Sequence, residues 1–151
     1  MTIRLSLAPA AVLGSLALAS AAQAHITVWP NHSTLSAREK YVVRVPNERA
    51  SATVRIDGEF PPGVAVSSLE EVPGWTAELH RDGSGRVVGA TWTGRLAPER
   101  FVEFGLLAAN PSTGDSAAWK FTQTYADGTR VEWTGPKGSK TPAPVVTFTR
   151  P

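Results

Sequence analysis

The chain has 151 residues, no cysteine, and fifteen Lys and Arg against thirteen Asp and Glu. Without cysteine it can form neither a disulfide framework nor a thiolate metal site. The near balance of charge leaves no basic stripe for nucleic acid and no polybasic patch for a membrane surface. These counts favour a small globular protein that binds neither nucleic acid nor membranes.

Residues 1–24 have the pattern of a secretion signal. Arg4 supplies a positive charge, residues 5–18 are rich in Ala and Leu, and small residues stand at positions 22 and 24. This pattern is an A-x-A cleavage site, and the apolar run is shorter than the ~20 residues of a membrane-spanning helix. We therefore predict cleavage between Ala24 and His25, and export to the periplasm or the medium. Residues 25–151 then form one mature domain, in which no apolar run approaches bilayer length.

The mature sequence favours an all-β fold. Short stretches alternate apolar and polar residues and are broken by Gly, Pro and Asp, which is typical of a β-sandwich or barrel. In the first stretch Ile26 and Val28 share a face, and a later one ends at Pro46. Asp-Gly pairs at 82–83 and 127–128 predict hairpin turns. We predict about eight to ten strands in two packed sheets, with the five tryptophans and several Val and Phe residues filling the space between them.

His25 becomes the first residue of the chain if the signal is cleaved as predicted. Its α-amino nitrogen and its imidazole Nδ1 could then chelate one metal ion, because both nitrogens can lose a proton to a metal near neutral pH. Nitrogen donors of this kind favour Cu(II). The alternative is that histidine follows the cleavage site only by chance.

Further ligands are weakly indicated by the sequence alone. A second imidazole, as in oxidative polysaccharide-cleaving copper enzymes, could come from His32 or His80. We interpret His32 as a solvated residue of a polar loop, and His80 as a residue on the solvent face of its strand. Glu48, just after a strand, could add a carboxylate oxygen or be an ordinary turn residue. No nucleophile elbow, phosphate-binding glycine loop or H-E-x-x-H pair supports an enzyme.

Five landmarks in the mature sequence together indicate a family. In chain order they are A-H-I-T-V-W-P at 24–30, K-Y-V-V-R-V-P-N-E-R at 40–49, P-G-W at 73–75, W-T-G at 92–94 and Q-T-Y-A-D-G-T-R-V-E-W-T-G at 123–135. Their order resembles the YcnI-like family of bacterial copper-binding proteins. The resemblance implies an immunoglobulin-like β-sandwich that is exported and handles copper.

The resemblance also implies a site, a monohistidine brace for Cu(II). Its metal ligands would be the amine and imidazole of His25 and the carboxylate of Glu48 in the V-P-N-E motif, with Trp133 of the V-E-W-T-G motif close to the metal. Many relatives continue into a proline-rich linker and a transmembrane helix, whereas this chain stops at Pro151, so we expect a soluble periplasmic form.

The leading hypothesis is therefore a periplasmic copper chaperone or homeostasis factor, not an enzyme, which works with other periplasmic or membrane copper-handling proteins. Two alternatives stay open. One is a secreted copper-dependent oxidative enzyme, which would need a second histidine ligand. The other is a metal-free β-sandwich interaction module, in which His25 is incidental.

Overall fold

Twelve strands make up the part of the chain that the structure describes, residues 24–151 of a computed structural model. The predicted signal peptide, except for Ala24, lies outside these residues. No helix in the described part has the length and apolar character that crossing a membrane requires. In chain order the strands are β1 (Thr27–Trp29), β2 (His32–Thr34), β3 (Arg38–Asn47), β4 (Thr53–Glu59), β5 (Ala65–Leu69), β6 (Thr76–Arg81), β7 (Val87–Leu96), β8 (Arg100–Ala109), β9 (Ser116–Ala118), β10 (Lys120–Tyr125), β11 (Arg130–Trp133) and β12 (Val145–Thr149).

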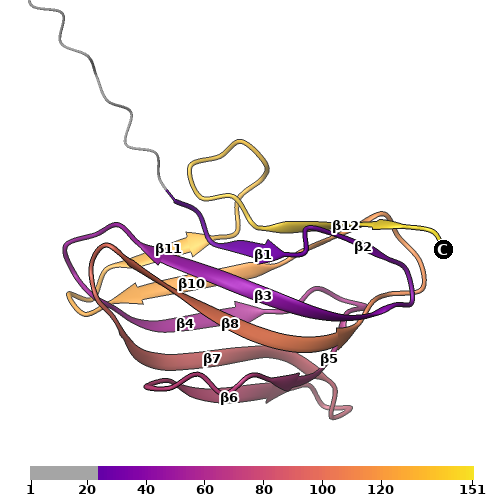
Figure 1. The fold of residues 1–151 in the computed structure, drawn as a ribbon, viewed down its shortest axis with the longest axis horizontal. Coiled ribbons are helices and arrows are strands. Elements are labelled where there is room, and N and C mark those ends of the chain that lie inside the picture. The colour runs from indigo at the N-terminus through magenta and orange to yellow at the C-terminus, as the bar shows by residue number, and fades with distance from the viewer. Residues whose placement is uncertain (1–23) are drawn as a thin grey trace, which may run out of the picture.

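Two large sheets form the sandwich. One has the order β1-β3-β8-β5 and the other β11-β10-β4-β7-β6 (Figure 1). This confirms the predicted all-β sandwich. The twelve strands of residues 24–151 exceed the eight to ten predicted, because a third sheet, β2-β12-β9, was not predicted. Its strands β2 and β9 have three residues each and pair only with β12, so they are too short to show a period in the sequence.

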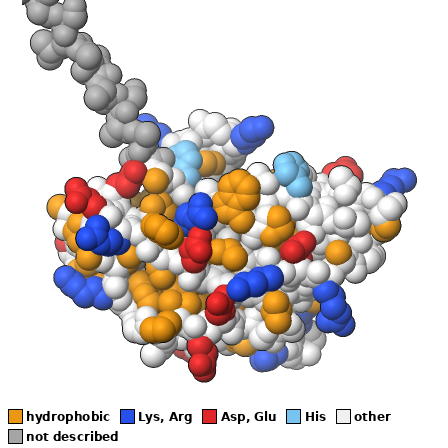
Figure 2. All heavy atoms as spheres, in the orientation of Figure 1, with side chains coloured by type: hydrophobic (Ala, Val, Ile, Leu, Met, Phe, Trp, Pro, Cys, Tyr) orange, Lys and Arg blue, Asp and Glu red, His pale blue; other side chains and the backbone are white. Residues whose placement is uncertain are grey.

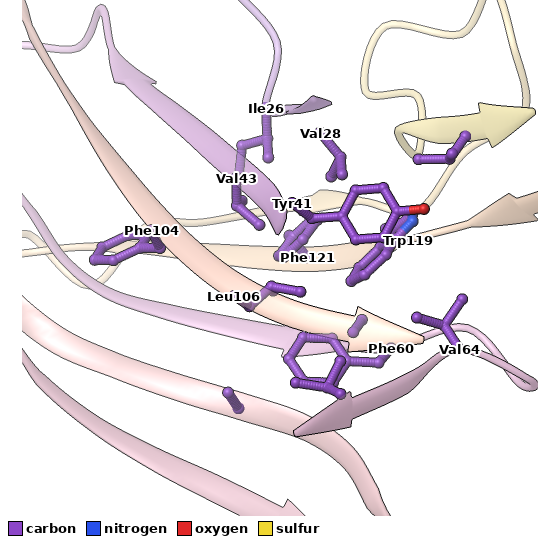
Figure 3. Packing of buried hydrophobic residues seen from close by; sticks show 14 of the residues in the cluster. Ile26, Val28, Tyr41, Val43, Phe60, Val64, Phe104, Leu106, Trp119 and Phe121 are labelled. Carbon is purple, nitrogen blue, oxygen red and sulfur yellow. The ribbon is translucent and has the colours of Figure 1, made fainter. Parts of the chain in front are cut away.

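The space between the sheets is filled by the alternating apolar residues. Tyr41, Val43 and Val45 of β3 are fully buried, and so are Trp119 and Phe121 from the opposite side of the sandwich. Figure 3 shows side chains from both sheets pointing into this shared interior, where the rings of Tyr41 and Trp119 lie 5.2 Å apart. Each large apolar side chain buried in this way contributes roughly 1.5–3 kcal/mol. The core therefore fixes the position of both sheets.

The predicted hairpin at 127–128 is confirmed. The β10–β11 turn is closed by a hydrogen bond of 2.9 Å from the backbone N–H of Tyr125 to the carbonyl of Thr129. Gly128 has a φ of 85°, which glycine adopts without the steric cost that other residues meet. This turn sets the register in which Trp133 of β11 pairs with Phe121 of β10.

Strand pairing brings the start of the domain to the end of β3. β1 runs antiparallel to β3, with Thr27 opposite Arg44 and Val28 opposite Val43. Continued backwards, this register sets His25 beside Pro46, with Glu48 just beyond. Ile26 and Val28 are buried, as the alternation predicted. The prediction that all five tryptophans fill the core is wrong for Trp29, which is exposed because it alternates with Val28 onto the outer face of β1. Because β1 is anchored by Ile26 and Val28, His25 is held at one end of the sandwich.

Candidate metal centre

Glu48 sits in a tight turn directly after β3. The preceding residue, Asn47, is buried and fixes this turn: its side-chain amide donates to the carbonyls of Ser51 at 3.0 Å and Leu96 at 3.1 Å, and its oxygen accepts from the backbone N–H of Arg49. The Glu48 carboxylate itself is exposed. Oε2 accepts a hydrogen bond of 2.8 Å from the backbone N–H of Ala24. The predicted oxygen ligand therefore lies beside the residue that precedes His25.

His25 and Trp133 face one another. Their ring centroids are 5.5 Å apart and their planes are tilted by 60°. His25 is exposed, whereas Trp133 is buried, as predicted for a core tryptophan. Within residues 24–151 no hydrogen bond engages the ring nitrogens of His25, and no Lys or Arg forms a salt bridge with Glu48. Among the described residues, the ring nitrogens of His25 and Oε1 of Glu48 therefore have no hydrogen-bond partner, and the indole of Trp133 lies beside the imidazole.

Gln123 supports this arrangement, and the sequence analysis did not single it out. It is fully buried on β10. Its amide oxygen accepts from Trp133 Nε1 at 3.2 Å, and its amide nitrogen donates to the Pro46 carbonyl at 3.0 Å and to Thr53 Oγ1 at 2.8 Å. One side chain thus ties the indole on β11 to the end of β3 in the other sheet. The sequence does contain a signal for this role. Gln123 alternates with Trp119, Phe121 and Tyr125, so it is the one polar side chain on an otherwise aromatic inward face.

The other two histidines do not join the site. The loop predicted around His32 is wrong, because His32 begins β2, where its Nδ1 contacts Thr147 Oγ1 on β12. The parallel pairing with β12 forms through contacts distant in sequence, so local composition did not reveal it. His80 is exposed on β6, as predicted, and its Nε2 lies 3.0 Å from Thr91 Oγ1. In residues 24–151 no three His, Cys, Asp or Glu side chains gather as a possible metal site.

A hollow of about 870 Å³ adjoins Glu48 and Trp133. It is lined from β3 by Pro46, from the following turn by Arg49, from the β10–β11 hairpin by Tyr125 and Arg130, and from the loop before β12 by Lys140. The Arg49 guanidinium lies 4.9 Å from the centre of the Tyr125 ring, and burial raises the pKa of Tyr125, so this phenol stays neutral at pH 7.

The donor set suits a borderline divalent metal. An imidazole and a carboxylate are present, and proteolysis between Ala24 and His25 would add a primary amine at the same point. Two nitrogens and one oxygen fit Cu(II), which favours tetragonal coordination by N and O donors. In the uncut chain the His25 nitrogen is a peptide amide, which does not offer that donor. The set of three donors would therefore be complete only after such a cut.

Comparisons with known proteins identify the family of this chain. A family model described as "Domain of unknown function (DUF1775)" matches residues 25–148. The chain is 34% identical over 149 residues to the copper-binding protein CutI of Bacillus subtilis (strain 168), a match that covers 97% of this chain and 73% of CutI.

Solved structures identify the sandwich type. An uncharacterized protein from Nocardia farcinica with an immunoglobulin-like fold is 28% identical, with a TM-score of 0.73 over 83% of this chain and 98% of that one. A cohesin module from a Clostridium perfringens family 33 glycoside hydrolase, 8% identical, shares the fold with a TM-score of 0.55 over 84% and 97% of the two chains. The predicted immunoglobulin-like sandwich is thus confirmed. Together with the family match and the CutI relative, these findings show that the chain belongs to the DUF1775 family, the YcnI-like copper-binding proteins that its five landmarks resemble.

Proposed function

We propose that this protein is an exported copper-binding protein that holds Cu(II) through the N-terminal amine and imidazole of His25 and the carboxylate of Glu48. The observation that carries the proposal is the 2.8 Å hydrogen bond from the Ala24 N–H to Glu48 Oε2, beside the His25 ring on Trp133. The proposed oxygen ligand thus lies next to the residue whose removal would create the amine. The relative CutI is named as a copper-binding protein, which supports the same metal here.

Each residue has a distinct role in this proposal. Copper is the cargo. The amine and imidazole of His25 close a chelate ring, and Glu48 adds a hard anionic oxygen that favours Cu(II) over the softer Cu(I). Trp133 covers one side of the imidazole and limits its rotation, and Gln123 fixes the indole in turn. Reduction would then weaken binding, because an amine, an imidazole and a carboxylate suit Cu(I) poorly.

The role we propose is copper trafficking or homeostasis, without catalysis, in the periplasm or outside the cell. The single imidazole supports this choice. The alternative oxidative enzyme needs a second histidine ligand, and in the described residues His32 and His80 are engaged with Thr147 and Thr91. Handing copper on would involve other copper-handling proteins, which an exposed site at one end of the sandwich leaves room to approach.

The test is a Cu(II) titration followed by electron paramagnetic resonance. The full chain is expressed with export, and the processed protein is checked by intact mass for an N-terminal His25. We expect one Cu(II) per chain with two nitrogen ligands. A form that retains residues 1–24 should bind at least about 100-fold more weakly, because it lacks the amine donor.

A matched pair of variants tests the oxygen ligand. Glu48→Gln should weaken Cu(II) binding and change the copper spectrum, whereas Glu103→Gln, an exposed carboxylate on β8 paired with Arg44, should change neither. Three nitrogen ligands in the wild type would instead support the oxidative enzyme. Absence of stoichiometric copper from the processed protein would support the metal-free interaction module.

A further inference from the structure

The donors that the chain supplies leave the coordination sphere of the metal incomplete. The proposed site has three donor atoms, and Cu(II) with N and O ligands favours four in a plane. Within residues 24–151 no cluster of three His, Cys, Asp or Glu side chains exists that could supply the missing donor. Among these residues no third side chain of these types joins His25 and Glu48, so the fourth position is open to water or to a bound molecule.

The hollow beside Glu48 and Trp133 is the space from which such a donor would come. Its volume of about 870 Å³ exceeds what a few water molecules need. Its walls are charged. Arg49, Arg130 and Lys140 line it together with two carboxylates, Glu48 and Glu132. Once Glu48 is a metal ligand, three cations face one remaining carboxylate, so the hollow favours an anion.

The cations come from three separate segments around the hollow. Arg49 follows Glu48 and rests on the ring of Tyr125, which limits the positions of its guanidinium. Arg130 opens β11, and Lys140 lies in the loop before β12. Two carboxylates outside the lining act electrostatically on these cations, Asp127 on Arg49 and Asp57 on Arg130. Two guanidinium groups suit a carboxylate, because their planar forks match its two oxygens.

We infer that this hollow binds a small polycarboxylate anion, and that the protein takes up Cu(II) together with such an anion as a ternary complex. This inference rests on the proposed function for the metal and adds the chemical class of its partner ligand. One carboxylate of the anion occupies the open position on Cu(II), and the others contact Arg49, Arg130 and Lys140. No bond is made or broken apart from the exchange of one copper ligand.

Citrate is the probe. It is titrated into the processed protein loaded with one Cu(II), at constant ionic strength, and followed by electron paramagnetic resonance. We expect a new copper spectrum that keeps the two protein nitrogens. In the double variant R130Q/K140Q the citrate concentration for half conversion should rise about fivefold or more, since each surface ion pair contributes up to ~1 kcal/mol. The control R38Q/K120Q carries the same change in charge at two exposed cations outside this lining. In this control the citrate concentration for half conversion should change less than twofold.

A second measurement separates this inference from the copper proposal. Citrate is titrated into copper-free protein, and the indole N–H signal of Trp133 is followed by nuclear magnetic resonance in the same three proteins. A shift that weakens only in R130Q/K140Q supports the anion site even if copper does not bind. The inference is overturned if citrate removes copper without a ternary spectrum. It is equally overturned if sulfate has the same effect, or if both double variants respond alike.

Discussion

The two edges of the five-stranded sheet both carry a histidine, a carboxylate and a tryptophan close by, yet they differ in what those groups are free to do. At the β6 edge His80 contacts Thr91, and Thr91 donates to Asp57 at 2.7 Å. Asp57 also binds Arg55 through both of its oxygens. His80 Nε2 and both oxygens of Asp57 therefore already have partners. At the β11 edge the His25 ring and the Glu48 carboxylate keep donor atoms available, within the described residues, next to Trp133.

On the proposed function, residue type alone therefore does not define the metal site. Strand order separates the edges by β10, β4 and β7, which is about 19 Å at the usual spacing between strands. Neither edge can therefore lend a ligand to the other. Figure 2 shows acidic and basic side chains interspersed over one face of the molecule, so what distinguishes the β11 edge is the local arrangement of its donors.

The largest expected effect comes from replacing the histidine at each edge. H25A should remove Cu(II) binding from the processed protein, a loss of more than about 100-fold, because both the imidazole and the chelate ring disappear. H80A, at the other edge, should bind Cu(II) as the wild type does. Isothermal titration with Cu(II) measures both. Equal loss in the two variants would mean that the edges are not distinct and that His25 is not a ligand.

The next largest effect is expected from replacing Gln123, which supports Trp133 at the β11 edge. Q123L keeps the size of the side chain but leaves Trp133 Nε1 and the Pro46 carbonyl without a partner, and each buried group left unpaired costs about 1–3 kcal/mol. Urea unfolding should show this loss. Cu(II) affinity should fall about 10-fold, because a support of the metal site is removed. A variant that is destabilised yet keeps the wild-type copper spectrum would restrict Gln123 to a structural role.

A smaller effect is expected at the β6 edge and depends on pH. Hydrogen bonds from Arg55, and then from Thr91, hold the pKa of Asp57 below its ordinary value, although partial burial opposes them. Because this pKa is lower in the folded state, the contribution to stability is present above the unfolded pKa and is lost as pH falls through the folded one. D57N should lower the free energy of unfolding at pH 7 by up to ~1 kcal/mol. Urea unfolding at pH 7 and near pH 3 should show the difference shrink in acid, and Cu(II) binding should not change.

Much of the fold could be predicted because its signals are local. The alternation of Tyr41, Val43 and Val45 gave the inward face of β3, and Asp127-Gly128 gave a hairpin. The third sheet could not be predicted, since β2 and β12 pair in parallel across more than a hundred residues. The same limit applies to the site. Nothing in the sequence near Glu48 shows that β1 lies beside β3, and only the resemblance brought His25, Glu48 and Trp133 together.

Because the first strand is short, metal binding at its end should affect how long the protein survives proteolysis. β1 has three residues, pairs with β3 alone in its sheet and contributes Ile26 and Val28 to the core. In the copper-free processed protein its free end is the place where the sandwich should open most readily. A metal ion shared by His25 and Glu48 would join that end to the end of β3, and would slow its release. Copper-loaded protein should therefore outlast copper-free protein in the presence of aminopeptidases, which would give the cell a way to clear copies that have no cargo.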